Sequence, residues 1–230
     1  MSVRIPHRFL ERLEYTGGSG NIRVIILGSF NPGEPDMADL PEDYRAELNI
    51  LFSTQKYRRF KQVQNFYDRP PNRFWGIMDR INNPDLYAKN GHKFRNIDGL
   101  KFFRGGDRDA VFLRQQCFCR ANGIFISDVV KAISTIDFKN VYNNFSDVVV
   151  NKHVTEFNSD HLLELIAANP MAQVIFNVKE SPLIPTISQQ LHLLRDAAGT
   201  FRSHWMPSTS GAAGGRYEEL LPSWQKAIQL

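Results

Sequence analysis

Four short apolar runs alternate along the chain with longer segments of helical spacing, and this alternation constrains the fold more than any other feature. The runs are the predicted strands, and they cover residues 22–27, 124–127, 173–176 and 201–205. A continuous apolar run bounded by turn residues is typical of a central strand in a parallel sheet. Because strands and helices alternate, the economical arrangement places helices on both faces of that sheet. We therefore expect an α/β fold, a three-layer α/β/α sandwich with a central four-stranded, mainly parallel sheet.

The helical segments are identified by apolar residues that recur every three or four positions, as Tyr44, Leu48 and Leu51 do. The predicted helices cover residues 8–15, 41–52, 73–81, 107–120, 159–168, 184–197 and 216–229. Two stretches near 34–64 and 82–106 do not fit the common frame and are interpreted as insertions. The length of 230 residues suits one compact unit, so we expect a single domain over residues 1–230.

The composition permits an anionic partner without requiring one, because the formal net charge is only +4. Cys117 and Cys119 are separated by one residue, which is too close for an ordinary disulfide, and the chain lacks partner cysteines for a zinc site. The first residues mix charged with apolar side chains, unlike a secretory signal. No run of about 18 apolar residues could span a membrane. We expect a cytoplasmic protein with reduced thiols and no membrane partner.

Small, polar and aromatic residues follow the predicted strands, and in an open α/β sheet such strand ends converge on a ligand site. The first loop is Gly-Ser-Phe-Asn-Pro-Gly at 28–33, in which Phe30 would contact a flat ligand such as a nucleobase. The amide of Asn31 either positions a water or belongs to an ordinary Asn-Pro-Gly turn. Glu34 and Asp36 lie just behind it, as alternative water-activating carboxylates or as solvated loop charges.

The stretch 66–75 is unusually aromatic and leads into a predicted helix. Aromatic rings stack on bases, and each such contact contributes about 1–3 kcal/mol. Tyr67 precedes a Pro-Pro turn and is the candidate for stacking, whereas Phe74 and Trp75 are expected to anchor the helix in the core. Asn72 is interpreted as a helix cap, as a base- or water-contacting amide, or as both.

Two further strand ends carry groups that could read the edge of a base. The carboxylate of Asp128 either accepts hydrogen bonds from the base or orients a neighbouring amide, or it caps the turn after its strand, and the same functional and structural interpretations apply to Asn177. The small residues Ser208, Thr209, Ser210 and Gly211 precede the last predicted helix, where exposed backbone N–H groups make a phosphate site. The alternative for this loop is a plain glycine-rich connection.

Metal and covalent chemistry are not indicated by the sequence. The six histidines show no His-x-x-x-His spacing, and no Gly-x-Ser-x-Gly elbow is present. We expect no metal, no cofactor and no covalent intermediate.

In this order, these motifs resemble the uracil-DNA glycosylase superfamily. The loop 28–33 resembles its first motif, where a glycine-led strand exit carries the water-positioning residue. Pro-Asn-Arg-Phe-Trp at 71–75 is similar to the mismatch-specific uracil glycosylase and hypoxanthine-DNA glycosylase branches. Met-Pro-Ser-Thr-Ser at 206–210 resembles the second motif, and Gly-Ile-Phe-Ile-Ser-Asp at 123–128 resembles the strand that ends in the base-reading residue. The resemblance covers residues 22–33, 66–80, 123–131 and 172–228.

The resemblance implies a monofunctional DNA glycosylase that hydrolyses the N-glycosidic bond of a deaminated or mismatched base, uracil or hypoxanthine, flipped out of DNA. It makes Asn31 the residue that holds the attacking water, with Asn72 as its rival. Tyr67 would stack on the base. The remaining implied contacts are Asp128 or Asn177 to the edge of the base, and Ser208, Thr209, Ser210, Gly211, Arg69 and Arg73 to DNA. The partner would be damaged or mismatched DNA, bound by a monomer.

Two other function classes remain open on the residues themselves. The first is a catalytically silent nucleic-acid-binding protein of the same fold, which is favoured by Met206 standing where classical uracil enzymes have a histidine. The second is an α/β enzyme that acts on a small nucleoside-like metabolite. The salt dependence of binding distinguishes these two classes. Phosphate contacts make the affinity for DNA fall steeply as salt rises, whereas binding of a nucleoside would be insensitive to salt.

Overall fold

A computed structural model gives the structure of the chain, and it describes residues 2–10, 21–54, 57, 65–68, 72–85, 103, 106–143, 146–178, 180–210 and 217–228. The strands are β1 (Val3–Pro6), β2 (Val24–Gly28), β3 (Ile124–Asp128), β4 (Val130–Thr135), β5 (Val154–Phe157), β6 (Gln173–Phe176) and β7 (Ser203–Trp205). The helices are α1 (Glu42–Ser53), α3 (Phe74–Asn82), α5 (Arg108–Ala121), α6 (Phe138–Asn143), α7 (Asp147–His153), α8 (Ser159–Ala168), α9 (Pro185–Ala198) and α10 (Tyr217–Ile228).

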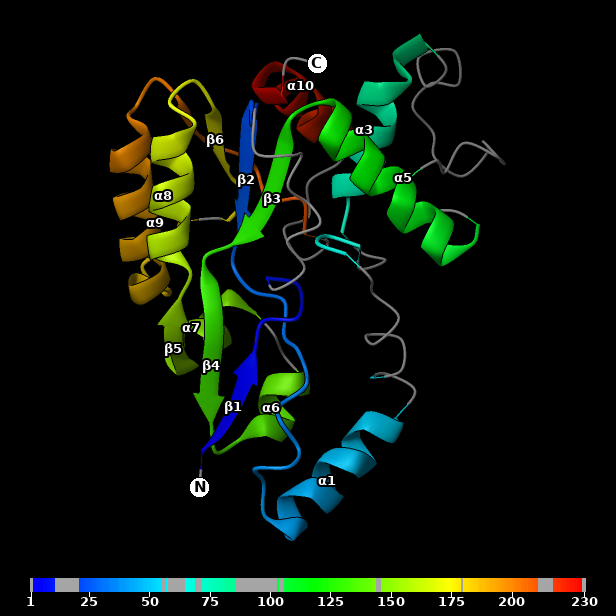
Figure 1. Cartoon of the computed structure of the whole chain (residues 1–230), viewed down its shortest axis with the longest axis vertical. Helices are drawn as coiled ribbons and strands as arrows, with labels where there is room; N and C mark the ends of the chain where they lie inside the picture. Colours follow the sequence, from blue (N-terminus) through cyan, green and yellow to red (C-terminus); the bar gives the residue numbers. More distant parts are fainter. Residues whose placement is uncertain are drawn as a thin grey trace.

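The central sheet has four strands in the order β3-β2-β6-β7, and every pairing in it is parallel. Helices α8 and α9 lie on one side of this sheet, and α3, α5 and α10 lie on the other (Figure 1). The predicted three-layer α/β/α sandwich around a four-stranded sheet is therefore confirmed. Each of the four predicted apolar runs overlaps one of these strands, and β2 and β3 extend one residue beyond their runs.

Successive residues of β2 point to opposite sides of the central sheet, and all of them are buried, so both faces of the sheet are covered. Ile25 and Leu27 belong to a core cluster that includes side chains of α8 and α9, such as Leu162 and Leu191. Val24 and Ile26 belong to a second cluster, formed with side chains of the opposite layer. That second cluster contains Trp75 from α3, Phe118 from α5 and Trp224 from α10.

A second sheet, which the sequence analysis did not predict, adjoins the carboxyl end of the first (Figure 1). It has three strands in the order β1-β4-β5, and both pairings are antiparallel. Strand β4 follows β3 after the single residue Val129, so the segment 128–130 is a direct passage between two sheets rather than a loop. The N-terminal strand β1 is thereby brought beside the strand ends of the central sheet.

The predicted helices at 41–52, 73–81, 107–120, 159–168, 184–197 and 216–229 correspond to α1, α3, α5, α8, α9 and α10. The predicted helix at 8–15 extends into residues outside the described part, and Arg8–Leu10 form a bend and turn. Of the two proposed insertions, the first contains α1, and most of the second lies outside the described residues. Cys117 and Cys119 are free thiols, as expected. Within the described segments, no helix has both the length and the apolar character needed to cross a membrane.

Asp107 caps helix α5, because its Oδ1 accepts a hydrogen bond of 3.0 Å from the backbone N–H of Ala110. Replacing Asp107 with alanine is expected to lower the free energy of unfolding by about 1 kcal/mol, since the first turn then loses a partner for one N–H. Urea denaturation followed by circular dichroism measures the change. Asp160→Ala in the first turn of α8 is the control and should cost less, and equal losses would contradict the capping role.

Candidate functional site

The first loop, residues 28–33, runs from the end of β2 toward the end of β1. Its backbone is held there by two hydrogen bonds, Arg8 N–H to Asn31 O at 2.8 Å and Gly33 N–H to Pro6 O at 2.7 Å. An isolated bridge also pairs His7 with Pro32. The loop is therefore fixed between the two sheets, and the partly exposed side chain of Asn31 lies at their junction.

Asp128, the last residue of β3, connects this loop to β1. Its Oδ2 accepts a hydrogen bond of 2.6 Å from Asn31 Nδ2 and lies 2.8 Å from His7 Nε2. The side chains of His7 and Asp128 are both almost completely buried, at 1% exposure each. A buried carboxylate is costly unless it is hydrogen-bonded, and here an amide N–H and a histidine ring nitrogen meet one of its oxygens. Asn31 and Asp128, which were predicted to converge, are thus directly bonded.

Gly28 provides the room in which Asp128 and Tyr67 approach the end of β2. A Cβ atom at this position would lie 2.7 Å from the Tyr67 hydroxyl oxygen and closer still to Asp128 Oδ1. No side chain fits at that distance from two polar atoms. The second oxygen of Asp128 and the hydroxyl of Tyr67 therefore lie against the same point of the backbone because residue 28 is a glycine.

Tyr67 has a backbone φ of 59°, and among the described residues it is the sole non-glycine with a positive φ. A bulky residue in this region stores strain, which is found most often at functional sites. Tyr67 is partly exposed as a residue, and its ring packs on Phe74 at a centroid distance of 4.7 Å, whereas the hydroxyl is buried near the side chain of Asn177. Burial raises the pKa of Tyr67 well above its usual value, and Asp128 raises it further, although Asn177 acts in the opposite direction. The hydroxyl therefore stays protonated at neutral pH.

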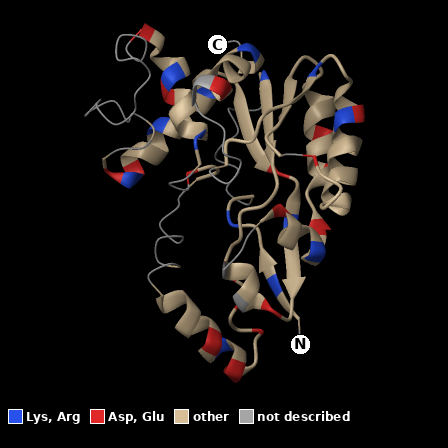
Figure 2. Ribbon diagram, turned by 180° about the vertical axis from the view of Figure 1, so that it is seen from behind, with Lys and Arg blue, Asp and Glu red and all other residues tan. Residues whose placement is uncertain are grey.

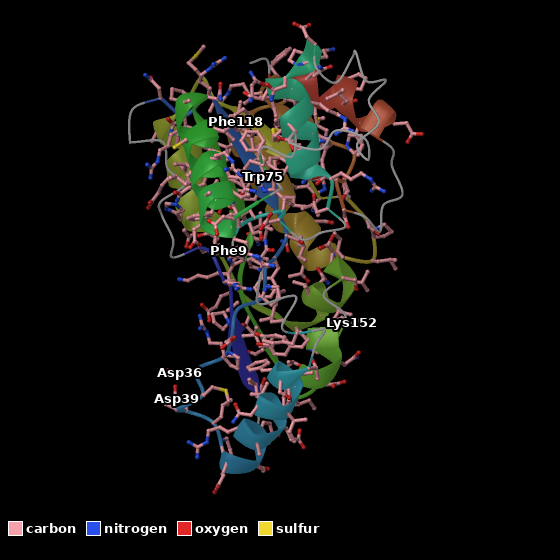
Figure 3. All side chains as sticks on the ribbon, turned by 90° about the vertical axis from the view of Figure 1, so that its right-hand side faces the viewer. Phe9, Asp36, Asp39, Trp75, Phe118 and Lys152 are labelled. Atoms are coloured by element: carbon pink, nitrogen blue, oxygen red, sulfur yellow. The ribbon has the colours of Figure 1, made fainter. Side chains whose placement is uncertain are left out.

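Trp75 holds the segment before Tyr67 from inside α3. Its Nε1 donates a hydrogen bond of 2.8 Å to the carbonyl of Phe66, and its side chain is fully buried. Trp75 and Phe74 are core anchors of the helix, as expected, and Figure 3 shows Trp75 in the upper body of the molecule with Phe118.

Asn177 and Thr209 form a closed pair. Asn177 Nδ2 donates to Thr209 Oγ1 at 2.9 Å, and the Thr209 N–H donates to Asn177 Oδ1 at 3.1 Å. Thr209 is fully buried. These bonds join the end of β6 to the loop after β7, so both side chains act in the structure as the anchor of that loop.

Further polar groups before α3 and after β7 are bonded near the Asn177–Thr209 pair. The Arg73 N–H donates to Thr209 O at 2.8 Å, and the Arg73 guanidinium donates to Ser210 O at 3.3 Å. The Ser208 hydroxyl accepts from the Ser210 N–H at 3.2 Å. Asn72 Oδ1 accepts from the Phe74 N–H at 2.9 Å, but the N-cap of α3 is Arg73, so the predicted cap lies one residue before the true one.

Five other predicted positions are not part of this cluster or lie outside the described residues. Phe30 is buried and packs edge-on against His7 at 5.6 Å, in the core rather than on the surface. Asp36 is exposed and accepts from the Ala38 N–H at 3.0 Å, and Figure 3 shows it at the far end of the molecule near Asp39. Glu34 Oε1 accepts a hydrogen bond of 3.3 Å from the Tyr57 hydroxyl. Arg69 and Gly211 fall outside the described residues.

Sequence reasoning missed His7. It is 121 residues from Asp128 and belongs to no motif, so its only signal is a polar ring directly after a short strand. The described residues contain no group of three or more metal-ligating side chains that could hold a metal ion. What the arrangement offers instead is a buried carboxylate, an amide bound to it, and the protonated hydroxyl of a partly exposed tyrosine.

Comparison with known proteins found no family model, no curated protein and no solved structure that matches the chain. The resemblance to uracil-DNA glycosylases therefore stays a prediction that rests on the motifs.

Proposed function

We propose that the protein is a monofunctional DNA glycosylase that hydrolyses the N-glycosidic bond of a deaminated or mismatched base, uracil or hypoxanthine, flipped out of DNA. The observation that carries the proposal is the 2.6 Å bond between Asn31 and Asp128 at the carboxyl ends of β2 and β3. Ligands of open α/β sheets bind at this edge. The motifs that resemble glycosylase motifs meet there.

The Asn31–Asp128 pair suits attack by water on a sugar carbon. Because Nδ2 of Asn31 is bound to the carboxylate, Oδ1 is the atom that accepts a hydrogen bond from the attacking water. An amide is a poor base, so Asn31 contributes mainly by positioning the water. The negative charge of Asp128 would stabilise the positive charge that develops on the sugar as the base departs.

Tyr67 suits the contact with the flipped base. Tyr67 is partly exposed, and its ring would offer a stacking surface, which contributes about 1–3 kcal/mol per base. The protonated hydroxyl, which lies at the end of β2 near Asn177, would donate a hydrogen bond to a carbonyl oxygen of the base. Uracil and hypoxanthine both carry such an oxygen.

Arg73, Ser208 and Ser210 would contact DNA phosphates from the loop beside α3. Ser208 and Ser210 follow β7 at the same carboxyl edge of the sheet as Asn31 and Asp128, and Arg73 bonds to Ser210 from the start of α3, so the DNA backbone would pass the site as the base enters it. Helix α1 has a different character, because Glu42, Asp43 and Glu47 make it rich in acidic residues (Figure 2). DNA is expected to bind away from α1.

The test is base release from labelled oligonucleotides that carry uracil, hypoxanthine, xanthine or thymine mismatches, in single and double strands. Hot alkali reveals abasic sites. Release by the parental protein that is lost in Asn31→Ala and retained in Asn72→Ala supports the proposal and the role of Asn31. Asn169→Ala, at the end of α8 away from the site, is the control.

Each other outcome has a defined meaning. Binding of mismatched duplex without release of any base would favour the silent binding protein. Release from free nucleosides with no dependence on salt would favour the metabolite enzyme. A product trapped by borohydride would contradict the monofunctional mechanism.

A further inference from the structure

His7 is a buried group at the site that the proposed function does not use. Both of its ring nitrogens are occupied. Nδ1 accepts from the backbone N–H groups of Phe9 at 3.0 Å and Leu10 at 3.1 Å, and Nε2 faces Asp128 Oδ2 at 2.8 Å.

This arrangement determines where the proton of the ring lies. A nitrogen that accepts from two N–H groups carries no proton of its own, so the hydrogen of neutral His7 is on Nε2. An ionised carboxylate only accepts, which requires a donor at the same nitrogen. The backbone turn after β1 and the carboxylate of Asp128 thus select the same tautomer.

The same reasoning determines the orientation of Asn31. Its amide meets Asp128 Oδ2, which accepts, so the amide nitrogen faces the carboxylate and Oδ1 faces away from it. His7 and Asn31 share this one oxygen as acceptor, so the position of the oxygen relative to β1 decides where the amide lies.

His7 itself is held firmly. Its backbone N–H donates to Lys131 O on β4 at 2.8 Å. Its ring lies 5.5 Å from the ring of Phe66 and 5.6 Å from that of Phe30, on separate segments of the chain. A ring fixed on these sides provides a rigid reference for the carboxylate.

We propose that His7 is a positioning residue for the reaction: through Asp128 it fixes the amide of Asn31 so that Oδ1 is directed at the attacking water. The inference rests on the proposed function for the reaction that it serves. The hydrogen bonds themselves are open to measurement without any substrate.

The discriminating variants are His7→Gln and His7→Asn. Both replace the ring by a neutral amide, but glutamine extends as far as Nε2 and can donate to Asp128, whereas asparagine extends only as far as Nδ1. We expect His7→Gln to keep most of the parental single-turnover rate of base release. His7→Asn should lower that rate on the order of 10²-fold, the cost of misplacing a reacting group by about 1 Å, with the Kd for DNA unchanged. His192→Asn, which alters an exposed histidine–carboxylate pair, is the matched control and should be silent.

The second measurement is NMR of uniformly 15N-labelled protein. The ring 15N shifts report the tautomer of His7, and the side-chain NH₂ signals of Asn31, assigned with Asn31→Ala, report the bond to Asp128. We expect the Nε2–H tautomer, and Asn31 signals that stay in place in His7→Gln and move in His7→Asn.

These outcomes separate the two proposals. If the parental protein releases no base, the proposed function fails, while the Asn31 signals still decide whether residue 7 orients the amide. Equal Asn31 signals, or equal rates, in the two variants would overturn the inference. Should His7→Asn fail to fold, Asp128→Ala removes the acceptor from Asn31 directly, and unchanged Asn31 signals in that variant would overturn it too.

Discussion

Replacing Gly28 with alanine is expected to lower the rate of base release by about 10³-fold, because one methyl group would displace two groups of the site together. The added Cβ would lie 2.7 Å from the Tyr67 hydroxyl oxygen, 3.3 Å from a ring carbon of Tyr67, and nearer still to Asp128 Oδ1. Asp128 cannot retreat without breaking its bonds to His7 and Asn31. Tyr67 cannot retreat easily either, because its backbone is already strained at a φ of 59°.

Single-turnover release and DNA binding, measured on the same preparation, test this expectation. Gly106→Ala is the control, since Gly106 has a φ of 90° and open space around it. That variant suffers backbone strain with no intrusion at the site, so its activity should be unaffected. A Gly28→Ala protein with parental activity would show that the approach of Asp128 and Tyr67 to residue 28 has no part in the reaction.

The largest loss of stability is expected from Trp75→Ala, at about 3–5 kcal/mol. The side chain is fully buried between α3 and the central sheet. Its ring packs against those of Phe74 and Phe103, with centroid distances of 5.0 Å and 5.5 Å. Its removal leaves a cavity and also deprives the Phe66 carbonyl of its donor. Because Phe66 precedes Tyr67, base release should fall as well.

Urea denaturation measures this loss, and Trp75→Phe separates its two causes. Phenylalanine fills most of the space but cannot donate to the Phe66 carbonyl, so it should cost less than alanine. Phe201→Ala is the control, because Phe201 is 94% exposed and its removal should change stability little. A loss below 1 kcal/mol for Trp75→Ala would contradict the packing described here.

The central sheet could be predicted because its strands are buried on both faces and therefore read as continuous apolar runs. The run at 173–176 matches β6 residue for residue. The run at 201–205 began too early, because Phe201 is apolar and yet lies in an exposed turn before β7.

The second sheet gave weaker signals for physical reasons. Strand β1 has only Val3 and Ile5 as fully buried positions and ends at Pro6. In β4 the alternation is broken by shifts of register between Val130 and Ile133. Such strands are stabilised by pairing with segments far away in the sequence, which no local pattern records.

The candidate site was foreseen in part, because strand ends of a parallel sheet must meet. This logic placed Asn31 near Asp128 but said nothing of His7, which arrives from the other sheet. It also could not show that Asn177 and Thr209 would bond to each other, since an amide at a strand end looks the same whether it faces a ligand or a neighbouring loop.

The pairing of β1 with β4 also bears on the order in which the protein is made. Val3 pairs with Thr135, so β1 leaves the ribosome long before β4, the strand with which it pairs. Contacts of such long sequence separation form late in folding. His7 reaches Asp128 only after this closure, which means that a nascent or truncated chain could complete β2 and β3 without completing the site.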